Sequence, residues 1–264
     1  MHRFYISPKN WHPDTLALIG SEAHHARDVL RMKRGEKVVL FNGRGREITA
    51  EIIDLGSSEI RLRKLHEAET PPLCCRIVLG QAVPKGKNME LIVQKAVEIG
   101  AAEIAPIISD RTIVQVDSES AMQKQSKWQQ IAIEAAKQSG QNWLPRVHVP
   151  RKLGEFFDTA TPNAGFDLHL IGSLQPGAQH LKKILADYSS EHQNRPQSVL
   201  MLVGPEGDFT PAELALARRH ECRPMTLGPI ILRVETAAIY CLSVLSYELL
   251  TEQRVAAAVP GTEP

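Results

Sequence analysis

From residue 73 onward, short apolar segments alternate with segments of helical character, and this alternation constrains the fold more than any other feature. Expected strands cover residues 76–83, 103–108, 166–172, 198–204 and 223–228. Expected helices cover residues 88–99, 119–139 and 236–250. The segment SVLMLVG at 198–204 is apolar throughout, which is typical of a strand buried on both faces of a parallel sheet. The sequence therefore predicts an α/β domain with a mostly parallel sheet covered by helices.

Local signals mark where several of these elements begin and end. Gly100 and Gly140 follow two expected helices and are suited to the left-handed conformation that ends a helix. The sequence Thr210-Pro211-Ala212-Glu213 is a capping box with proline in the first turn, so it predicts a further helix start. The polar segment 187–198 is expected to be a surface loop.

Residues 1–70 have a different, β-rich pattern. Apolar residues alternate through 36–55, with Asn42-Gly43 placed where a hairpin would turn, and again through 59–67. Thr70-Pro71-Pro72 stiffens and interrupts the chain. We therefore expect one domain over 1–70, a second over 73–252 and a flexible tail over 253–264.

Composition excludes some classes of protein. The chain has 264 residues and a formal net charge of +1, so it is not a uniformly basic nucleic-acid coat protein. A hydrophobic content of 43% excludes a mostly disordered chain. The four cysteines form no CxxC pair and have no histidine at metal-ligand spacing, so no metal is expected. With neither a signal-peptide pattern nor an apolar stretch of membrane-spanning length, the sequence predicts a cytoplasmic protein with reduced thiols and no membrane contact.

One stretch of the first domain is strongly basic. Residues 27–46 hold seven basic and two acidic side chains, a local excess of +5 in a nearly neutral chain. Such a stretch is either a solvated surface or a phosphate-binding face on a small β domain. Its basic members are Arg27, Arg31, Lys33, Arg34, Lys37, Arg44 and Arg46.

The segment GQAVPKGKN at 80–88 resembles a phosphate-binding loop only superficially. Five residues instead of four separate its glycines, and Asn88 stands where magnesium would need Ser or Thr, so an NTPase is not indicated. Lys85 and Lys87 nevertheless lie at a strand-to-helix turn, on the side where α/β proteins bind ligands. They are either part of a solvated loop or ligand contacts.

Two further segments follow expected strands near the C-terminus. Gly204-Pro205-Glu206-Gly207-Asp208-Phe209 leads from a buried strand into the capped helix, where backbone N–H groups and Glu206 could meet a ligand. In LGPIILRVETA at 227–237, Arg233 and Glu235 interrupt an apolar run. They need partners there, either each other at a helix start or a ligand.

These two segments, in this order and spacing, resemble the RsmE-type family of 16S ribosomal RNA uridine-N3 methyltransferases, in the SPOUT superfamily. The resemblance extends over nearly the whole chain. It is also carried by MHRFYI at the start, HHARDVLRMKRGEKVVLFNG, QAVPKGKNMELIVQKAVEIGA and EAAKQSGQNWLP at 134–145.

The resemblance implies an N-terminal PUA-like β-barrel that binds RNA and a C-terminal α/β methyltransferase domain with a deep trefoil knot. It implies a homodimer acting on a uridine of 16S rRNA, within the small ribosomal subunit, with S-adenosyl-L-methionine as cofactor. The implied cofactor residues are Ile171, Gly172, Gly204, Glu206, Gly207, Leu227, Gly228, Ile231 and Leu232. The implied RNA-binding residues are Arg27, Arg31, Lys33, Arg34, Arg44, Arg46, Lys85 and Lys87.

The chain departs from the family pattern at two positions. Asp208 stands where the family has glycine, which would be costly if the position needs positive φ. Ile230 replaces an arginine that the family usually has beside Arg233. These departures keep open the alternative of a non-catalytic RNA-binding homologue. A SPOUT methyltransferase with another RNA target is a further alternative.

Methylation of uridine N3 requires loss of the N3 proton, so an enzyme must stabilise the uridine anion or supply a base. We expect Arg233 to orient or stabilise the uracil. Glu206 and Glu235 are the carboxylates to test as a base. The target base must be single-stranded or flipped out of its stack.

Overall fold

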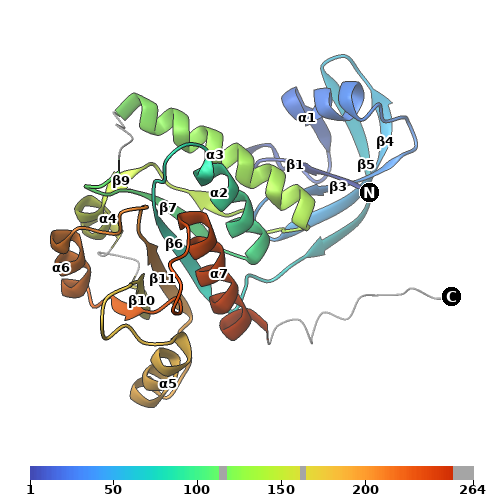
Figure 1. The fold of residues 1–264 in the computed structure, drawn as a ribbon. Helices are drawn as coiled ribbons and strands as arrows, with labels where there is room; N and C mark the ends of the chain where they lie inside the picture. The colour runs from blue at the N-terminus through green and yellow to red at the C-terminus, as the bar shows by residue number, and fades with distance from the viewer. Residues whose placement is uncertain (113–117, 161–164, 252–264) are drawn as a thin grey trace. The chain divides into compact units, whose positions relative to one another are not determined.

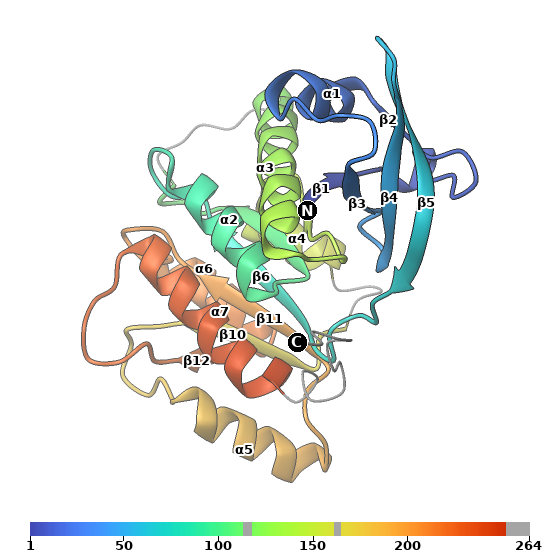
Figure 2. The same ribbon diagram turned by 90° about the vertical axis from the view of Figure 1, so that its right-hand side faces the viewer.

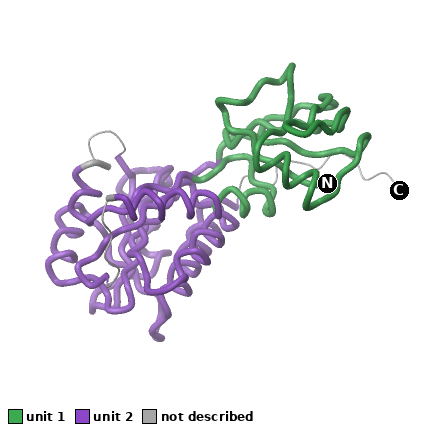
Figure 3. The backbone as a smooth tube through the Cα atoms, turned by 90° about the horizontal axis from the view of Figure 1, so that it is seen from above, with its two compact units in different colours: residues 1–72, 132–145 green, residues 73–131, 146–264 purple. Residues whose placement is uncertain are grey.

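The computed structural model describes residues 1–112, 118–160 and 165–251, so the tail predicted over 253–264 lies outside the described residues. The chain forms two compact units (Figure 3). Unit 1 contains residues 1–72 together with 132–145, and unit 2 contains the other described residues from 73 on.

Unit 1 is built on a five-stranded sheet, and the predicted hairpin is confirmed as the antiparallel pair β3–β4. Its core is an apolar cluster in which Phe4, Leu18, Leu40 and Ile60 have no exposed side-chain surface. The strand order is β1 (His2–Tyr5), β3 (Lys37–Phe41), β4 (Arg46–Leu55), β5 (Glu59–Glu69) and β2 (Ala17–Ile19).

Helical turns interrupt the β-rich region, and the sequence analysis missed them. A 3₁₀ turn spans Pro8–Asn10, and α1 (Gly20–His24) continues into a π-helical turn over His25–Val29. Ala23 and Ala26 of this segment are buried in the unit 1 core.

The segment 140–145 belongs to unit 1 because it packs on the hairpin turn. Asn42 Oδ1 accepts hydrogen bonds from the backbone nitrogens of Arg44 (2.8 Å) and Arg46 (3.2 Å), which closes the turn. Gly45 has φ +87°, and a Cβ there would lie 2.6 Å from the carbonyl oxygen of Thr70. Trp143 Nε1 donates to that same carbonyl at 2.8 Å, so the indole covers the turn.

Unit 2 confirms the expected parallel sheet. Every strand pairing in its described part is parallel, and the order is β12-β10-β11-β6-β7-β8, with β9 also paired to β7. The strands are β6 (Arg76–Ala82), β7 (Glu103–Ile108), β8 (Arg146–Val147), β9 (Arg151–Lys152), β10 (Leu168–Gly172), β11 (Ser198–Val203) and β12 (Arg223–Met225).

Helices cover both faces of this sheet (Figure 1 and Figure 2). α2 (Asn88–Ile99) and α7 (Val234–Leu250) pack against each other on one face. α4 (Leu153–Ala160) and α6 (Pro211–Arg219) bury Phe156, Phe157 and Ala217 in the core of the other face. The long helix α3 (Ser118–Ser139) contributes to both units.

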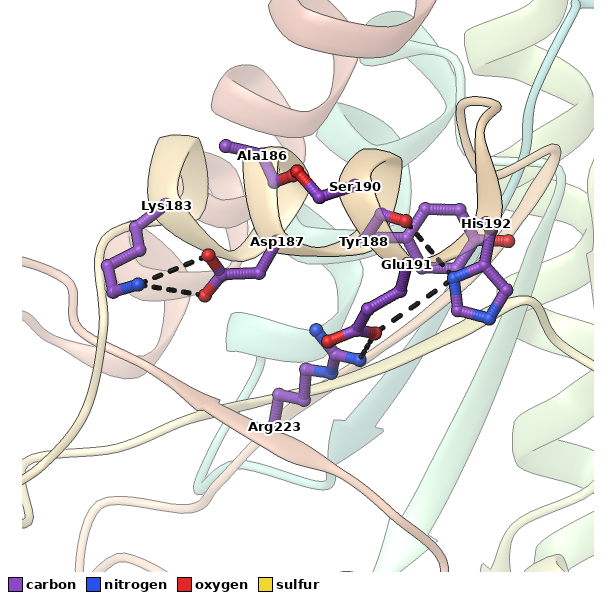
Figure 4. A network of polar contacts seen from close by, with 8 residues as sticks. All are labelled: Lys183, Ala186, Asp187, Tyr188, Ser190, Glu191, His192 and Arg223. Atoms are coloured by element: carbon purple, nitrogen blue, oxygen red, sulfur yellow. Dashed lines mark hydrogen bonds and ion pairs between the residues drawn. The ribbon is translucent and has the colours of Figure 1, made fainter.

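The loop predicted at 187–198 is wrong over its first half, because α5 extends over Leu181–His192. Figure 4 shows two ion pairs of its polar side chains, Lys183 with Asp187 (2.9 Å) and Glu191 with Arg223 of β12 (2.6 Å). Tyr188 on the inner face is buried. The buried residues Leu181, Ile184 and Tyr188 recur at helical spacing, so one apolar face stabilises this helix although most of its residues are polar.

Two further observations concern the whole described chain. No helix within 1–112, 118–160 or 165–251 is long and apolar enough to cross a membrane. Cys74, Cys75, Cys222 and Cys241 form no disulfide within the described residues, and burial raises the pKa of Cys75 and Cys222 to about 12.

Candidate active site

A cavity of about 640 Å³ lies at the carboxyl edge of the unit 2 sheet. Four parts of the chain line it: the start of α2, the end of β10 with the residues after it, the loop between β11 and α6, and the loop that leads into α7 with the first turn of that helix. Its lining consists of Asn88, Gly172, Ser173, Leu174, Val203, Gly204, Pro205, Glu206, Gly207, Asp208, Leu227, Ile230, Ile231, Leu232, Arg233, Val234, Glu235 and Ala237. This is the edge at which parallel α/β sheets bind ligands.

The loop between β11 and α6 is a tight turn. The backbone nitrogen of Asp208 donates to the carbonyl oxygen of Pro205 at 2.9 Å, and Asp208 has φ +62°. The position therefore has the positive φ that makes aspartate costly where the family has glycine. The predicted capping box is confirmed in full, since Thr210 and Glu213 exchange side-chain and backbone hydrogen bonds.

Glu206 projects from this turn and binds the backbone of the neighbouring loop. Its Oε1 accepts a hydrogen bond of 3.0 Å from the backbone nitrogen of Lys85. The loop after β6, which carries the exposed Lys85 and Lys87, is thereby joined to the loop after β11. One carboxylate oxygen of Glu206 thus has a structural partner while the residue still lines the cavity.

The loop into α7 has an exposed apolar surface, followed by an exposed arginine at the start of the helix. Ile230 and Ile231 are 72% and 78% exposed, although both line the cavity. Arg233 is the exposed N-cap residue of α7, and it forms no ion pair with any residue that the structure describes. Glu235 instead accepts a hydrogen bond of 3.2 Å from Asn88 Nδ2 on α2. The side chains of Arg233 and Glu235 are therefore not paired with each other at the helix start.

Most of the residues expected at the site line one cavity. Gly172, Glu206, Leu227, Arg233 and Glu235 do so, as do Gly204, Gly207, Ile231 and Leu232. Ile171 and Gly228 do not line it. Strand alternation turns the Ile171 side chain into the apolar core, where it is 4% exposed, and Gly228 makes a turn with φ +100°.

Asn88, Ser173 and Leu174 line the cavity but were not predicted as site residues from the sequence. Ser173 and Leu174 directly follow the predicted Gly172, so extending that loop by two residues would have included them. Asn88 lies at the start of α2, and only the chain fold brings it to Glu235, 147 residues away.

The basic side chains at 27–46 in unit 1 differ in their contacts. One is hydrogen-bonded within the unit, and the others form no ion pair in the described chain. Arg27 donates to Asp28 (2.8 Å) and to the carbonyl oxygens of Gly56 (3.1 Å) and Ser57 (2.7 Å), so its guanidinium secures the fold. The remaining members are exposed, and no ion pair of the described chain involves them. They are Arg31, Lys33, Arg34, Lys37, Arg44 and Arg46.

Comparison with protein families matches both units. A family model described as an RNA methyltransferase domain matches residues 71–246, and one described as an RNA methyltransferase PUA domain matches residues 18–65. Ribosomal RNA small subunit methyltransferase E of Bacillus subtilis is 28% identical over 249 residues, covering 89% of this chain and 90% of that protein. The protein of that name from Mesomycoplasma hyopneumoniae is 33% identical over 168 residues, covering 64% and 68%.

Solved structures agree with this assignment. Ribosomal RNA small subunit methyltransferase E from Neisseria gonorrhoeae, bound to S-adenosyl methionine, superposes with a TM-score of 0.80 at 31% identity, covering 94% of this chain and 98% of that one. A putative methyltransferase from Legionella pneumophila, in complex with S-adenosylmethionine, gives a TM-score of 0.81 at 34% identity, covering 93% and 97%. The chain is therefore a member of the ribosomal RNA small subunit methyltransferase E family, with an RNA methyltransferase domain and a PUA domain.

Proposed function

We propose that this protein transfers a methyl group from S-adenosyl-L-methionine to N3 of a specific uridine in 16S rRNA of the small ribosomal subunit. The observation that carries the proposal is Arg233, an arginine without an ion-pair partner in the described chain, which lines the cavity at the carboxyl edge of the unit 2 sheet. Family membership supports rRNA methylation, and the chemistry of the cavity supports the choice of cofactor and base.

The cavity suits S-adenosylmethionine in size and in chemistry. Its volume of about 640 Å³ lies within the range of small-molecule sites. Leu227, Ile231 and Leu232 offer apolar surface for an adenine ring, and the backbone of Gly204–Asp208 offers polar groups. The carboxylates of Glu206 and Asp208 complement a positively charged ligand. When bound, this cofactor supplies an activated methyl group.

Arg233 is placed to act on the uracil. Loss of the N3 proton leaves negative charge on the ring and its carbonyl oxygens, and a guanidinium aimed at that charge stabilises it. Because Arg233 forms no ion pair within the described chain, its charge is available to the substrate. Glu206 and Glu235 each have one oxygen bound, to Lys85 and Asn88 respectively, and they compete for the role of proton acceptor.

Exposed basic side chains of both units bind the RNA. In unit 1 these are Arg31, Lys33, Arg34, Arg44 and Arg46, while Arg27 acts through the fold. In unit 2, Lys85 and Lys87 are exposed on the loop that Glu206 joins to the cavity wall. Phosphate contacts of this kind position an RNA without reading its sequence.

We also propose a homodimer formed through α2 and α7. These helices pack together and expose Leu91 (40%), Tyr240 (42%) and Tyr247 (72%), an apolar surface that a second copy would cover. The proposal also includes domain limits at 1–70 and 73–252 and a deep trefoil knot in the second domain. It places the action of the protein in the cytoplasm, on the small ribosomal subunit.

Two measurements test the proposal. Calorimetry should detect binding of S-adenosylmethionine, and primer extension on small subunits treated with protein and cofactor should stop at the target, because N3 methylation blocks base pairing. Absence of binding at millimolar cofactor would favour the non-catalytic homologue. Methylation at another nucleotide would favour another RNA target.

A further inference from the structure

The peptide group between Gly207 and Asp208 is held at both ends. Its carbonyl oxygen accepts a hydrogen bond from Arg111 Nη1, and its N–H donates to the carbonyl oxygen of Pro205 at 2.9 Å. The Arg111 side chain runs along the loop, since a Cβ built on Gly207 would lie 3.4 Å from Arg111 Cδ. Arg111 comes from the loop after β7, two strands away from β11 in the sheet.

This peptide orientation keeps Asp208 in a conformation that side chains disfavour. Asp208 has φ +62°, in the left-handed region that non-glycine residues rarely adopt. A flip of the peptide by half a turn would bring that φ from +62° to about −118°, in the extended region open to any residue. The Asp208 side chain accepts a hydrogen bond of 2.7 Å from the backbone nitrogen of Phe209, which is a contact to its own neighbour and does not hold the Gly207 carbonyl. Arg111 therefore opposes a flip that aspartate would otherwise favour.

Arg111 is itself anchored to the helix that follows the loop. Its backbone nitrogen donates to Ser109 Oγ at 3.3 Å, and Ser109 Oγ donates to Glu213 Oε2 at 3.1 Å. The backbone nitrogen of Asp110 donates to Glu213 Oε1 at 3.1 Å. Glu213 is 7% exposed and also completes the capping box of α6. The segment 109–111 is thus hydrogen-bonded to Glu213 of α6, and the Arg111 guanidinium reaches Gly207 from this anchored segment.

We propose that Arg111, which does not line the cavity, is a positioning residue that locks the Gly207–Asp208 peptide and so keeps the cavity wall in its binding shape. The inference rests on the proposed function, because it assumes that this wall holds S-adenosylmethionine. It assigns a role to a residue outside the site itself.

The test is calorimetry of S-adenosylmethionine, without RNA, on the purified full-length protein and its variants. We expect R111A to weaken binding ~10-fold, R111K to restore part of the loss, and both to keep a melting temperature close to that of the parent protein. The control is R219A, because Arg219 is exposed in the last turn of α6 and does not line the cavity. It should leave the affinity unchanged.

The decisive comparison uses D208G, because glycine adopts positive φ without penalty. In a double-mutant cycle, R111A should cost ~10-fold when Asp208 is present but ~3-fold or less in the D208G background. Equal losses in both backgrounds, or no loss from R111A, would overturn the inference. If the parent protein itself failed to bind S-adenosylmethionine, the proposed function would fail instead, so the two failures are distinguishable.

Discussion

The backbone nitrogen of Lys85 lies 3.0 Å from Oε1 of Glu206, and this hydrogen bond joins the loop after β6 to the loop after β11. Arg111 binds the same β11 loop at Gly207 from the loop after β7. The wall of the cavity is thus fixed by contacts from two neighbouring loops, which favours a site that is largely preformed.

Substitution of Glu206 separates a structural role from a role as base. E206Q retains a side-chain oxygen that accepts from Lys85, so we expect its affinity for S-adenosylmethionine to stay within ~3-fold of that of the parent protein. E206A removes the acceptor and should weaken binding ~10-fold. Calorimetry measures both. If E206Q binds the cofactor normally but loses turnover, the carboxylate acts in proton transfer instead.

Removal of the Arg233 guanidinium should abolish most turnover while the fold persists. R233A should lower the methylation rate on the order of 100-fold, because an aimed cation stabilises the developing anion. Its melting temperature should change little, since the side chain is exposed and makes no ion pair in the described structure. Single-turnover primer extension reports the rate, with R219A as control. A normal rate in R233A would refute the assignment.

The free cations of the basic stretch should contribute to RNA affinity through counterion release. K33A and R34A should each weaken binding and reduce the slope of log affinity against log salt by ~0.7–0.9. The matched control is R61A, because Arg61 of the same unit is neutralised by Asp54 at 2.6 Å. Titration of labelled 16S rRNA over several salt concentrations provides the slopes. An equal effect of R61A would contradict a phosphate-binding role.

An ion-pair network at the amino end of the sheet should make stability depend on pH. Hydrogen bonds from His148 (2.6 Å) and Arg76 (2.7 Å) lower the pKa of Glu103 to about 2, although burial opposes the shift. A lowered pKa adds stability that is complete above the ordinary value of 4.5 and is lost as pH falls through about 2.

The matching variant is E103Q. It should destabilise the protein by about 1–3 kcal/mol at pH 7, because the side chain of Glu103 is 22% exposed and Arg76 loses its counter-ion. Its free energy of unfolding should also fall less steeply than that of the parent protein between pH 4.5 and 2. Urea denaturation over this range measures both effects. Parallel pH profiles would show that Glu103 contributes no pH dependence.

Helix caps and uniformly apolar segments in the sequence correctly predicted helix ends, a helix start and a buried strand. The helix starting at Asn88 ends at Gly100, whose φ is +99°, and Thr210-Pro211 begins α6 as its capping box requires. The strand at 198–203 is central and buried, as its uniform apolar composition indicates. In each case a residue or its immediate neighbours provide the physical cause.

Features that depend on contacts between distant segments could not be predicted in this way. Polar composition concealed α5, whose ion pair with Arg223 spans 32 residues, and nothing local places 132–145 in unit 1. At the site, consecutive loop residues were predicted, but Asn88 and Arg111 were missed. Their partners, Glu235 and Gly207, lie 147 and 96 residues away in the sequence.

The measurement that tests the central claim most directly is nucleoside mass spectrometry of 16S rRNA from a strain that lacks this protein. The account predicts loss of one N3-methyluridine, restored by the parent gene and not by the R233A variant. An unchanged amount of N3-methyluridine in the deletion strain would contradict it.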